Sequence, residues 1–167
     1  MKKNISLIGM AGVGKTFTSK ILAEKLNYEY ISADDLIAEE ALKIGANEDL
    51  LSDDDFMKLE EEVIVSLKNK VNVVIDTGGS VIYSPKAMEI LNEISFIVYL
   101  SDSAENIKKR FDDRGESHLV GMVKGMTFER LLEQRENLYE KYSHIKIDVL
   151  KHKEDIVPKI LNELNPL

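Results

Sequence analysis

The residues with the clearest chemistry lie near the start of the chain, where residues 9–16 read G-M-A-G-V-G-K-T. This is the G-x-x-x-x-G-K-[S/T] pattern, in which backbone N–H groups cradle phosphates. Lys15 supplies a cation that can bridge the β- and γ-phosphates, and the Thr16 hydroxyl can ligate Mg²⁺. An apolar run at residues 5–8 precedes the pattern and a helical run follows it. The sequence therefore predicts a nucleoside triphosphate site at a helix N-terminus.

A second candidate for this site is Asp76, which ends an apolar run at residues 71–75. Ligands of parallel sheets gather at the carboxyl ends of strands, so a carboxylate there can hold Mg²⁺ or one of its waters. Asp is also common in turns, so Asp76 could instead cap the turn at residues 77–80. The sequence leaves these two interpretations open.

Short apolar runs alternate with longer runs of helical period along the chain. The pattern predicts strands near residues 5–8, 28–31, 71–75, 94–100 and 145–150. It predicts helices near residues 15–25, 34–44, 56–67, 86–91, 104–111, 127–142 and 154–164. Strands that alternate with helices favour a parallel sheet covered on both faces. We therefore expect a three-layer α/β fold with a five-stranded parallel sheet, in a single domain over residues 1–167.

Residues 112–126 have no steady period and contain several charges and three glycines. This composition predicts a long loop. Structureless loops of such length are often lids over active sites. We expect this loop to close over bound substrates and to exclude the water that would otherwise take the phosphoryl group.

The composition narrows the partners of the site. The 167 residues include 22 basic and 30 acidic ones, for a net charge of −8. Proteins that bind nucleic acid usually carry a basic stripe, and a membrane helix needs about 18 apolar residues in a row; the sequence shows neither feature. The absence of cysteine excludes a disulfide scaffold and a catalytic thiol, and it fits a reducing cytosol. We expect a cytoplasmic monomer that acts on a small molecule rather than on nucleic acid or a membrane.

Three segments that follow the first motif also match a known sequence pattern. Residues 30–37 read Y-I-S-A-D-D-L-I, residues 77–80 read T-G-G-S, and residues 135–139 read R-E-N-L-Y. These segments resemble the two-Asp segment, the Thr-Gly-Gly-Gly turn and the Arg-x-x-Leu-Tyr helix of the shikimate kinase family, within the nucleoside-monophosphate-kinase-like group. The resemblance runs from residue 5 to about residue 149.

The resemblance implies an ATP-dependent kinase in which a hydroxyl of the acceptor attacks the γ-phosphoryl group. It implies that Asp34 contacts the acceptor hydroxyls and takes a proton, and that Gly78 and Gly79 let the acceptor approach the backbone. Arg135 would pair with an acceptor carboxylate, a role that suits its planar fork. A lid arginine, here Arg114, would stabilise the transferring charge together with the lysine of the first motif.

The resemblance also implies the nucleotide contacts and the cofactors. Arg110 stands where the family places basic residues beside the adenine. The expected cofactors are ATP and Mg²⁺, with Thr16 and Asp76 as metal ligands. The predicted nucleotide-binding residues are Gly12, Val13, Gly14, Lys15, Thr16, Phe17 and Arg110.

The family pattern is broken at four places: Ser32 replaces the first Asp of the pair, Met57 replaces a carboxylate-binding arginine, Ser80 replaces the third glycine, and residues 117–120 lack the lid arginine. We expect Asp76 to compensate for Ser32, and Arg114 for the lid. Two of the losses remove positive charge from the acceptor side. The resemblance predicts shikimate or a related small hydroxy acid as the acceptor, and these losses leave the choice between them open.

Two alternatives remain open at the level of sequence. Residues 32–35 also resemble the Asp-Gly-Asp-Asp segment of gluconate kinases, although the T-G-G and R-x-x-L-Y features match shikimate kinases better. The missing arginines are also compatible with a nucleotide-binding module that has lost turnover. A screen for acceptor-stimulated ADP release separates these alternatives.

Overall fold

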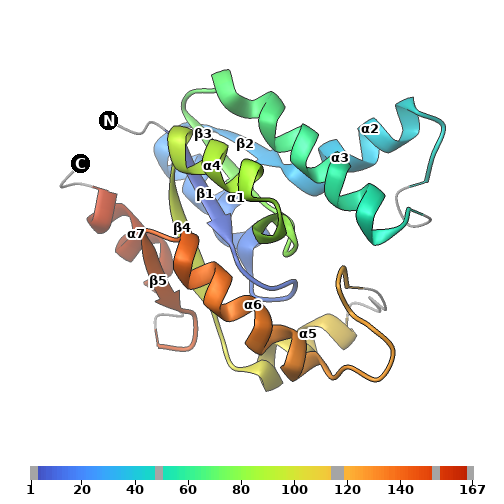
Figure 1. The fold of residues 1–167 in the computed structure, drawn as a ribbon. Coiled ribbons are helices and arrows are strands. Elements are labelled where there is room, and N and C mark those ends of the chain that lie inside the picture. The colour runs from blue at the N-terminus through green and yellow to red at the C-terminus, as the bar shows by residue number, and fades with distance from the viewer. Residues whose placement is uncertain (1–3, 48–50, 114–118, 152–154, 165–167) are drawn as a thin grey trace.

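Five parallel strands form the centre of the molecule (Figure 1). The computed structural model describes residues 4–47, 51–113, 119–151 and 155–164. The strands are β1 (Asn4–Ile8), β2 (Glu29–Ser32), β3 (Val73–Asp76), β4 (Ser95–Ser101) and β5 (Ile145–Asp148). Their order in the sheet is β2-β3-β1-β4-β5, and every neighbouring pair is parallel. This confirms the predicted five-stranded parallel sheet.

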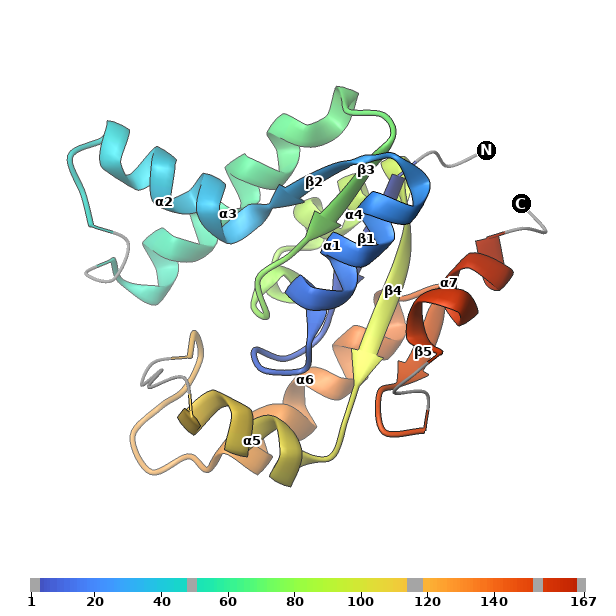
Figure 2. The ribbon, with the colours of Figure 1, turned by 180° about the vertical axis from the view of Figure 1, so that it is seen from behind.

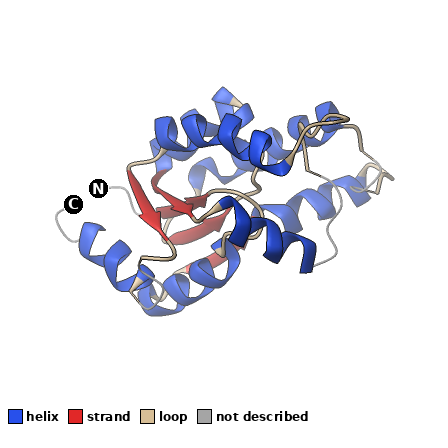
Figure 3. Ribbon diagram, turned by 90° about the horizontal axis from the view of Figure 1, so that it is seen from below, coloured by secondary structure: helices blue, strands red, loops and turns tan. Residues whose placement is uncertain are grey.

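Helices cover both faces of this sheet and give the predicted three layers (Figure 3). In the described part of the chain they are α1 (Lys15–Leu26), α2 (Ala33–Lys43), α3 (Asp53–Ser66), α4 (Pro85–Ile94), α5 (Ala104–Asp113), α6 (Phe128–Tyr142) and α7 (Ile156–Leu164). α1 and α7 lie on one face, seen from behind in Figure 2, and α4 and α6 lie on the other. α3 packs between α2 and α4.

The core lies on both sides of the three central strands. Every residue of β1, β3 and β4 is buried, which is typical of a parallel sheet covered on both faces. Leu7, Ile75 and Val98 have no exposed surface, and each such side chain stabilises the fold by about 1.5–3 kcal/mol through burial. The strands are therefore a rigid base for the residues that follow them.

The register brings the carboxyl ends of three strands together. Leu7 of β1 and Ser32 of β2 both pair with Asp76 of β3. The loop that follows β1 therefore lies beside Asp76 and beside the first turn of α2. In Figure 1 the α2–α3 pair and residues 119–126 lie at the same end of the molecule as this loop.

Local capping explains where the helices differ from the sequence prediction. α3 begins at Asp53, three residues before the predicted start, because the Ser52 hydroxyl accepts a hydrogen bond from the Asp55 N–H at 3.2 Å. α5 continues to Asp113, so the predicted loop starts later. A short 3₁₀ turn, η3 (Val81–Tyr83), follows the T-G-G-S turn and was not predicted. No helix among the described residues has the length and apolar content needed to cross a membrane.

Candidate active site

The loop between β1 and α1 forms an anion-binding cradle. Gly14 is the N-cap of α1 with φ of +107°, a backbone conformation that side-chain-bearing residues rarely adopt. No side chain caps this helix, so its first N–H groups face the pocket end rather than a protein oxygen. The Lys15 ammonium donates to the carbonyl oxygens of Gly9 at 2.8 Å and Met10 at 3.1 Å. The cation is thereby held over the loop, where the helix dipole also favours an anion.

A hydroxyl and a carboxylate meet beside this cradle. The Thr16 hydroxyl donates to Asp76 Oδ2 at 2.6 Å, and the Tyr30 hydroxyl donates to the same oxygen at 3.2 Å. Burial, reinforced by the Asp76 charge, raises the pKa of Tyr30 to about 12, so its hydroxyl stays a donor. Asp76 therefore does not cap the turn after β3. It accepts hydrogen bonds from α1 and β2 instead.

Ser32 is the N-cap of helix α2. Its hydroxyl accepts a hydrogen bond from the Asp35 N–H at 3.1 Å and so caps α2. Because Ser32 pairs with Asp76 in the sheet, the two residues lie side by side at the strand ends. The carboxylate at this edge thus comes from β3, while the β2 residue begins a helix.

One pocket of about 500 Å³ unites most of the predicted residues. It is lined by Ala11, Gly12, Gly14, Lys15, Thr16, Phe17, Asp34, Asp76, Thr77, Gly79, Arg110 and Asp113. Phe17 is 73% exposed at its edge. The side chain of Val13 is buried in the core, and its N–H donates to the Met10 carbonyl at 3.2 Å.

Gly78 and Arg135 do not line this pocket, but both lie close to residues that do. A Cβ at Gly78 would collide with Glu60 Oε1 and would come within 3.0 Å of Asp34 Oδ1. A Cβ at Gly79 would stand 3.1 Å from Arg135 Nη1. Glycine is therefore required at Gly78 by close approach, and the turn joins the α2 and α3 side chains to α6.

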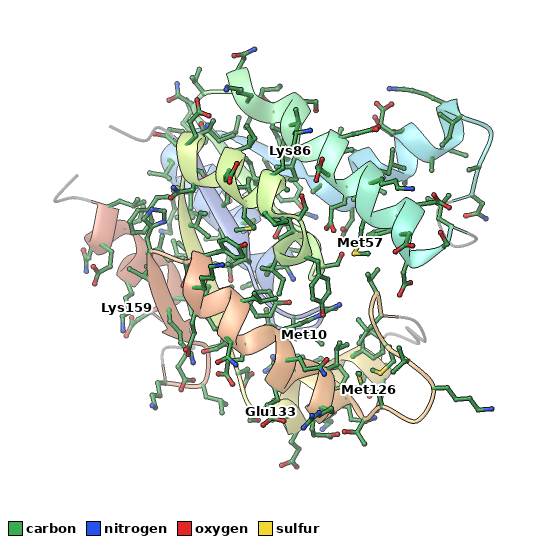
Figure 4. The ribbon with its side chains drawn as sticks, viewed as in Figure 1. Met10, Met57, Lys86, Met126, Glu133 and Lys159 are labelled. Carbon is green, nitrogen blue, oxygen red and sulfur yellow. The ribbon has the colours of Figure 1, made fainter. Side chains whose placement is uncertain are left out.

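Arg135 is almost fully buried at 1% exposure, on the inner face of α6. It donates through Nε to the Tyr83 hydroxyl at 3.1 Å, through Nη1 to the Met10 sulfur at 3.2 Å, and through Nη2 to the Val120 carbonyl. Met10 belongs to the loop after β1, and Figure 4 shows it beside α6. These bonds use three of the five guanidinium N–H groups and fix the plane of the fork.

Glu60 of α3 is the least expected member of the site. It is 2% exposed, and the Ser80 hydroxyl donates to its Oε2 at 2.7 Å. Burial raises the pKa of Glu60 to about 7. The family resemblance sets Glu60 apart from the two glutamates that follow it, but it was not among the predicted site residues; its place on the apolar stripe of α3 between Phe56 and Ile64 is a second signal in the sequence.

Tyr139 was also missed. It lies one turn after Arg135 on α6, is fully buried, and donates its hydroxyl to the Gly79 carbonyl at 2.6 Å. Burial raises its pKa well above the ordinary range, so this hydroxyl remains a donor. The T-G-G turn is therefore held in place by α6.

Arg110 joins the pocket from α5. Its Nη2 donates to Asp102 Oδ2 at 2.7 Å and its Nη1 to the Gly12 carbonyl at 3.3 Å. The predicted lid arginine, Arg114, lies outside the described residues. The described end of the predicted lid is anchored to α3, because the Gly121 N–H donates to Asp53 Oδ2 at 2.7 Å.

The donor set at Thr16 and Asp76 suits a hard divalent cation. Mg²⁺ prefers oxygen ligands and is usually held by one or two carboxylates together with substrate phosphates. Among the residues that the structure describes, no group of three or more His, Asp or Glu side chains could hold a metal without such help. The residues present therefore fit Mg²⁺ bound with a nucleotide.

A parallel sheet with a phosphate cradle after its central strand, and with a second set of polar groups facing it, defines an α/β phosphate-loop kinase. A model of the family described as shikimate kinase matches residues 11–165. The chain belongs to the shikimate kinase family, as the sequence segments indicated. It is thus an ATP-dependent phosphotransferase of this type.

Individual relatives agree with this assignment. The chain is 34% identical over 149 residues to a shikimate kinase of Francisella tularensis subsp. novicida, covering 87% of this chain and 85% of the relative. It is 36% identical over 140 residues to one of Caldicellulosiruptor bescii, with 83% and 81% covered. The structure of shikimate kinase from Acinetobacter baumannii in complex with shikimate superposes with a TM-score of 0.81 at 26% identity, covering 98% of this chain and 93% of that one.

Proposed function

We propose that this chain transfers the γ-phosphoryl group of ATP to a hydroxyl of shikimate or a closely related small hydroxy acid. The observation that carries the proposal is the single pocket lined by the phosphate loop together with Asp34 and Gly79. Two substrates bound in one pocket can react directly. The shikimate kinase relatives, one of them solved with shikimate, support this choice of acceptor.

In the proposed reaction, an acceptor hydroxyl oxygen forms a bond to the γ-phosphorus while the bond from that phosphorus to the bridging oxygen breaks. The products are ADP and a phosphate monoester, and the hydroxyl proton passes to Asp34. Phosphoryl transfer demands mainly positioning and charge stabilisation from the protein. Lys15 and Arg114 would supply positive charge to the transferring group. Closure of residues 112–126 would exclude water.

On the nucleotide side, the N–H groups of Gly12, Gly14 and the first turn of α1 would face the phosphates, as the absence of a side-chain cap on α1 supports. Phe17 and Arg110 border the pocket and would flank the adenine. Thr16 and Asp76 would hold Mg²⁺ with the phosphates. When bound, Mg²⁺ would neutralise charge on the β- and γ-phosphate oxygens.

On the acceptor side, the proposal assigns the acceptor carboxylate to Arg135. Its three internal bonds leave one N–H on each terminal nitrogen, which is the arrangement a carboxylate binds in a fork. Gly78 and Gly79 would let the acceptor lie against the backbone. Asp34 would face its hydroxyls.

The test is an ADP-release assay with ATP, Mg²⁺ and a panel of hydroxy acids, with Lys15→Ala as the inactive control. We expect stimulation by shikimate or by a close analogue, and phosphate-ester product by mass spectrometry. Stimulation by gluconate alone would favour the gluconate-kinase alternative. ATP binding without stimulation by any acceptor would overturn the proposal in favour of a non-catalytic module.

A further inference from the structure

Two hydroxyl groups from different elements bind one oxygen of the Asp76 carboxylate. Thr16 at the start of α1 donates to Oδ2 at 2.6 Å, and Tyr30 of β2 donates to the same Oδ2 at 3.2 Å. Each carboxylate oxygen has two lone-pair sites, so these two bonds use the acceptor capacity of Oδ2. Among the residues that the structure describes, none donates a hydrogen bond to Oδ1. The two oxygens of this buried carboxylate therefore differ in what they can still bind.

The position of Tyr30 follows from the register of β2. Side chains alternate along a strand, so Tyr30 and Ser32 lie on the same face, and Ser32 pairs with Asp76. The Ser32 hydroxyl accepts the Asp35 N–H and caps α2. The longer side chain of Tyr30 reaches Asp76 from two residues earlier in the strand. From α1, the Lys20 ammonium lies 5.4 Å from the centre of the Tyr30 ring and stabilises its position through a cation–π contact.

A carboxylate with one oxygen occupied in this way offers a cation a single ligand. Mg²⁺ requires near-octahedral geometry at short distances, keeps several of its waters, and is usually held by one or two carboxylates together with phosphates. Ca²⁺ is larger, takes more oxygen ligands and can bind both oxygens of one carboxylate. A bidentate contact of this kind would require Oδ2 to give up its hydrogen bonds from Thr16 and Tyr30. The arrangement at Asp76 therefore favours the smaller cation.

We propose that Tyr30 is a positioning residue that sets the cation preference of the nucleotide site. It acts through Asp76: because Tyr30 and Thr16 hold Oδ2, only Oδ1 of this carboxylate is available to a cation, and Ca²⁺ loses the bidentate contact. The inference deepens the proposed function and rests on it for the placement of the nucleotide-bound cation at Thr16 and Asp76. The edge between β2 and β3 thereby selects Mg²⁺ over Ca²⁺.

The test measures nucleotide binding without acceptor and without turnover. ADP is titrated calorimetrically into wild type, Tyr30→Phe and the control Tyr28→Phe, in Mg²⁺, in Ca²⁺ or in a chelator. Tyr28→Phe removes a hydroxyl immediately before β2 begins at Glu29. We expect Mg²⁺ to raise the ADP affinity of wild type more than Ca²⁺ does. Tyr30→Phe should lower the ratio of the ADP dissociation constant in Ca²⁺ to that in Mg²⁺ by roughly three- to tenfold, the effect of one lost hydrogen bond, and Tyr28→Phe should not change it.

A second comparison tests whether the effect of Tyr30 passes through Asp76. Asparagine has one side-chain oxygen, so Asp76→Asn excludes a bidentate contact whether or not the tyrosine hydroxyl is present. In the Asp76→Asn background, Tyr30→Phe should therefore leave the ratio of the two dissociation constants unchanged. A fall in the ratio of the same size in this double variant would overturn the inference.

Three results with the single variants also overturn it. They are an unchanged or increased ratio in Tyr30→Phe, an equal loss of affinity in both cations, as a purely structural role requires, and an ADP affinity of wild type that Mg²⁺ does not raise. Thermal unfolding establishes that the variants fold; if Tyr30→Phe does not, Tyr30→Leu, which also lacks the hydroxyl, takes its place. The expected change in ratio without acceptor-stimulated ADP release would refute only the proposed function, whereas normal release with an unchanged ratio would refute only this inference.

Discussion

The two ends of the pocket are built in different ways. At the phosphate end, a continuous loop supplies the cradle, and Lys15, Thr16 and Asp76 are bonded to protein oxygens or to each other. At the acceptor end, Asp34, Glu60 and Arg135 arrive from three helices and converge on the T-G-G turn.

This difference shows which end of the pocket selects its substrate. At the phosphate end the side chains are bonded within the protein, and the uncapped start of α1 is left for a phosphate group, which all nucleoside triphosphates share. The acceptor end holds a buried carboxylate oxygen without a partner and a guanidinium with two N–H groups to spare. The unsatisfied end is the one whose chemistry must be completed by a particular acceptor.

The largest effect should come from the phosphate end. Lys15→Ala should lower the rate of ADP release by at least about 100-fold, because it removes the cation aimed at the transferring charge. Lys25→Ala, an exposed change in the last turn of the same helix, is the control and should retain full activity. If the rate of ADP release by Lys15→Ala is within tenfold of the wild-type rate, the proposed difference between the phosphate end and the acceptor end is contradicted.

A change at Arg135 should affect the acceptor end of the pocket and leave the phosphate end unaffected. Arg135→Lys should raise the KM for the acceptor roughly 10- to 100-fold and leave the KM for ATP unchanged, because an ammonium cannot replace the planar fork. Steady-state kinetics with each substrate varied in turn measures both constants. Arg130→Lys, on the exposed side of α6 and paired with Glu133, is the matched control. Equal effects on both KM values would mean that Arg135 supports the whole pocket.

A smaller effect on activity is expected from a change at Asp76, which lies at the phosphate end of the pocket. Asp76→Ala should raise the Mg²⁺ concentration for half-maximal activity about tenfold, because one oxygen ligand is lost. Activity is measured against free Mg²⁺ at saturating ATP, with Asp54→Ala on the exposed first turn of α3 as control. Unchanged dependence on Mg²⁺ would show that Asp76 only orients Thr16.

The smallest effect concerns stability at the acceptor end. The pKa of Glu60 is about 7 in the folded chain against an ordinary value of 4.5. Between these pH values the unfolded chain releases the proton that the folded chain retains, so Glu60 makes the fold less stable as pH rises from about 4.5 to 7. Glu60→Gln removes this loss and should raise the Tm at pH 8 by roughly 5 °C relative to wild type.

The measurement is thermal unfolding of wild type, Glu60→Gln and the control Glu62→Gln at pH 5 and pH 8. The Tm advantage of Glu60→Gln should shrink toward pH 5, where the wild-type carboxyl is already protonated. A Tm difference that does not change with pH would contradict a raised pKa. A variant that is more stable but binds the acceptor more weakly would show that Glu60 is retained for binding rather than for folding.

Much of the fold and half of the site were predictable. The phosphate loop and the five strands follow from contiguous patterns, and so does the start of α6, where the Thr127 hydroxyl accepts a hydrogen bond from the Arg130 N–H. The start of α3 was placed too late, since its cap at Ser52 lies before the first apolar residue of the pattern. The place of Glu60 on the apolar stripe of α3 indicates burial, but only the packed structure shows that Ser80 and Gly78 lie against its carboxylate.

The sequence by itself determined what depends on neighbours in the chain: the strands, the helices and the cradle, whose N–H groups come from consecutive residues. The tertiary structure alone decided the rest. It placed Asp76 against Thr16 across 60 positions, and it brought Glu60 and Arg135 to the same turn from helices far apart in the chain. Contacts of this kind depend on how strands register and helices pack, and those follow from the burial of the whole core rather than from any single segment.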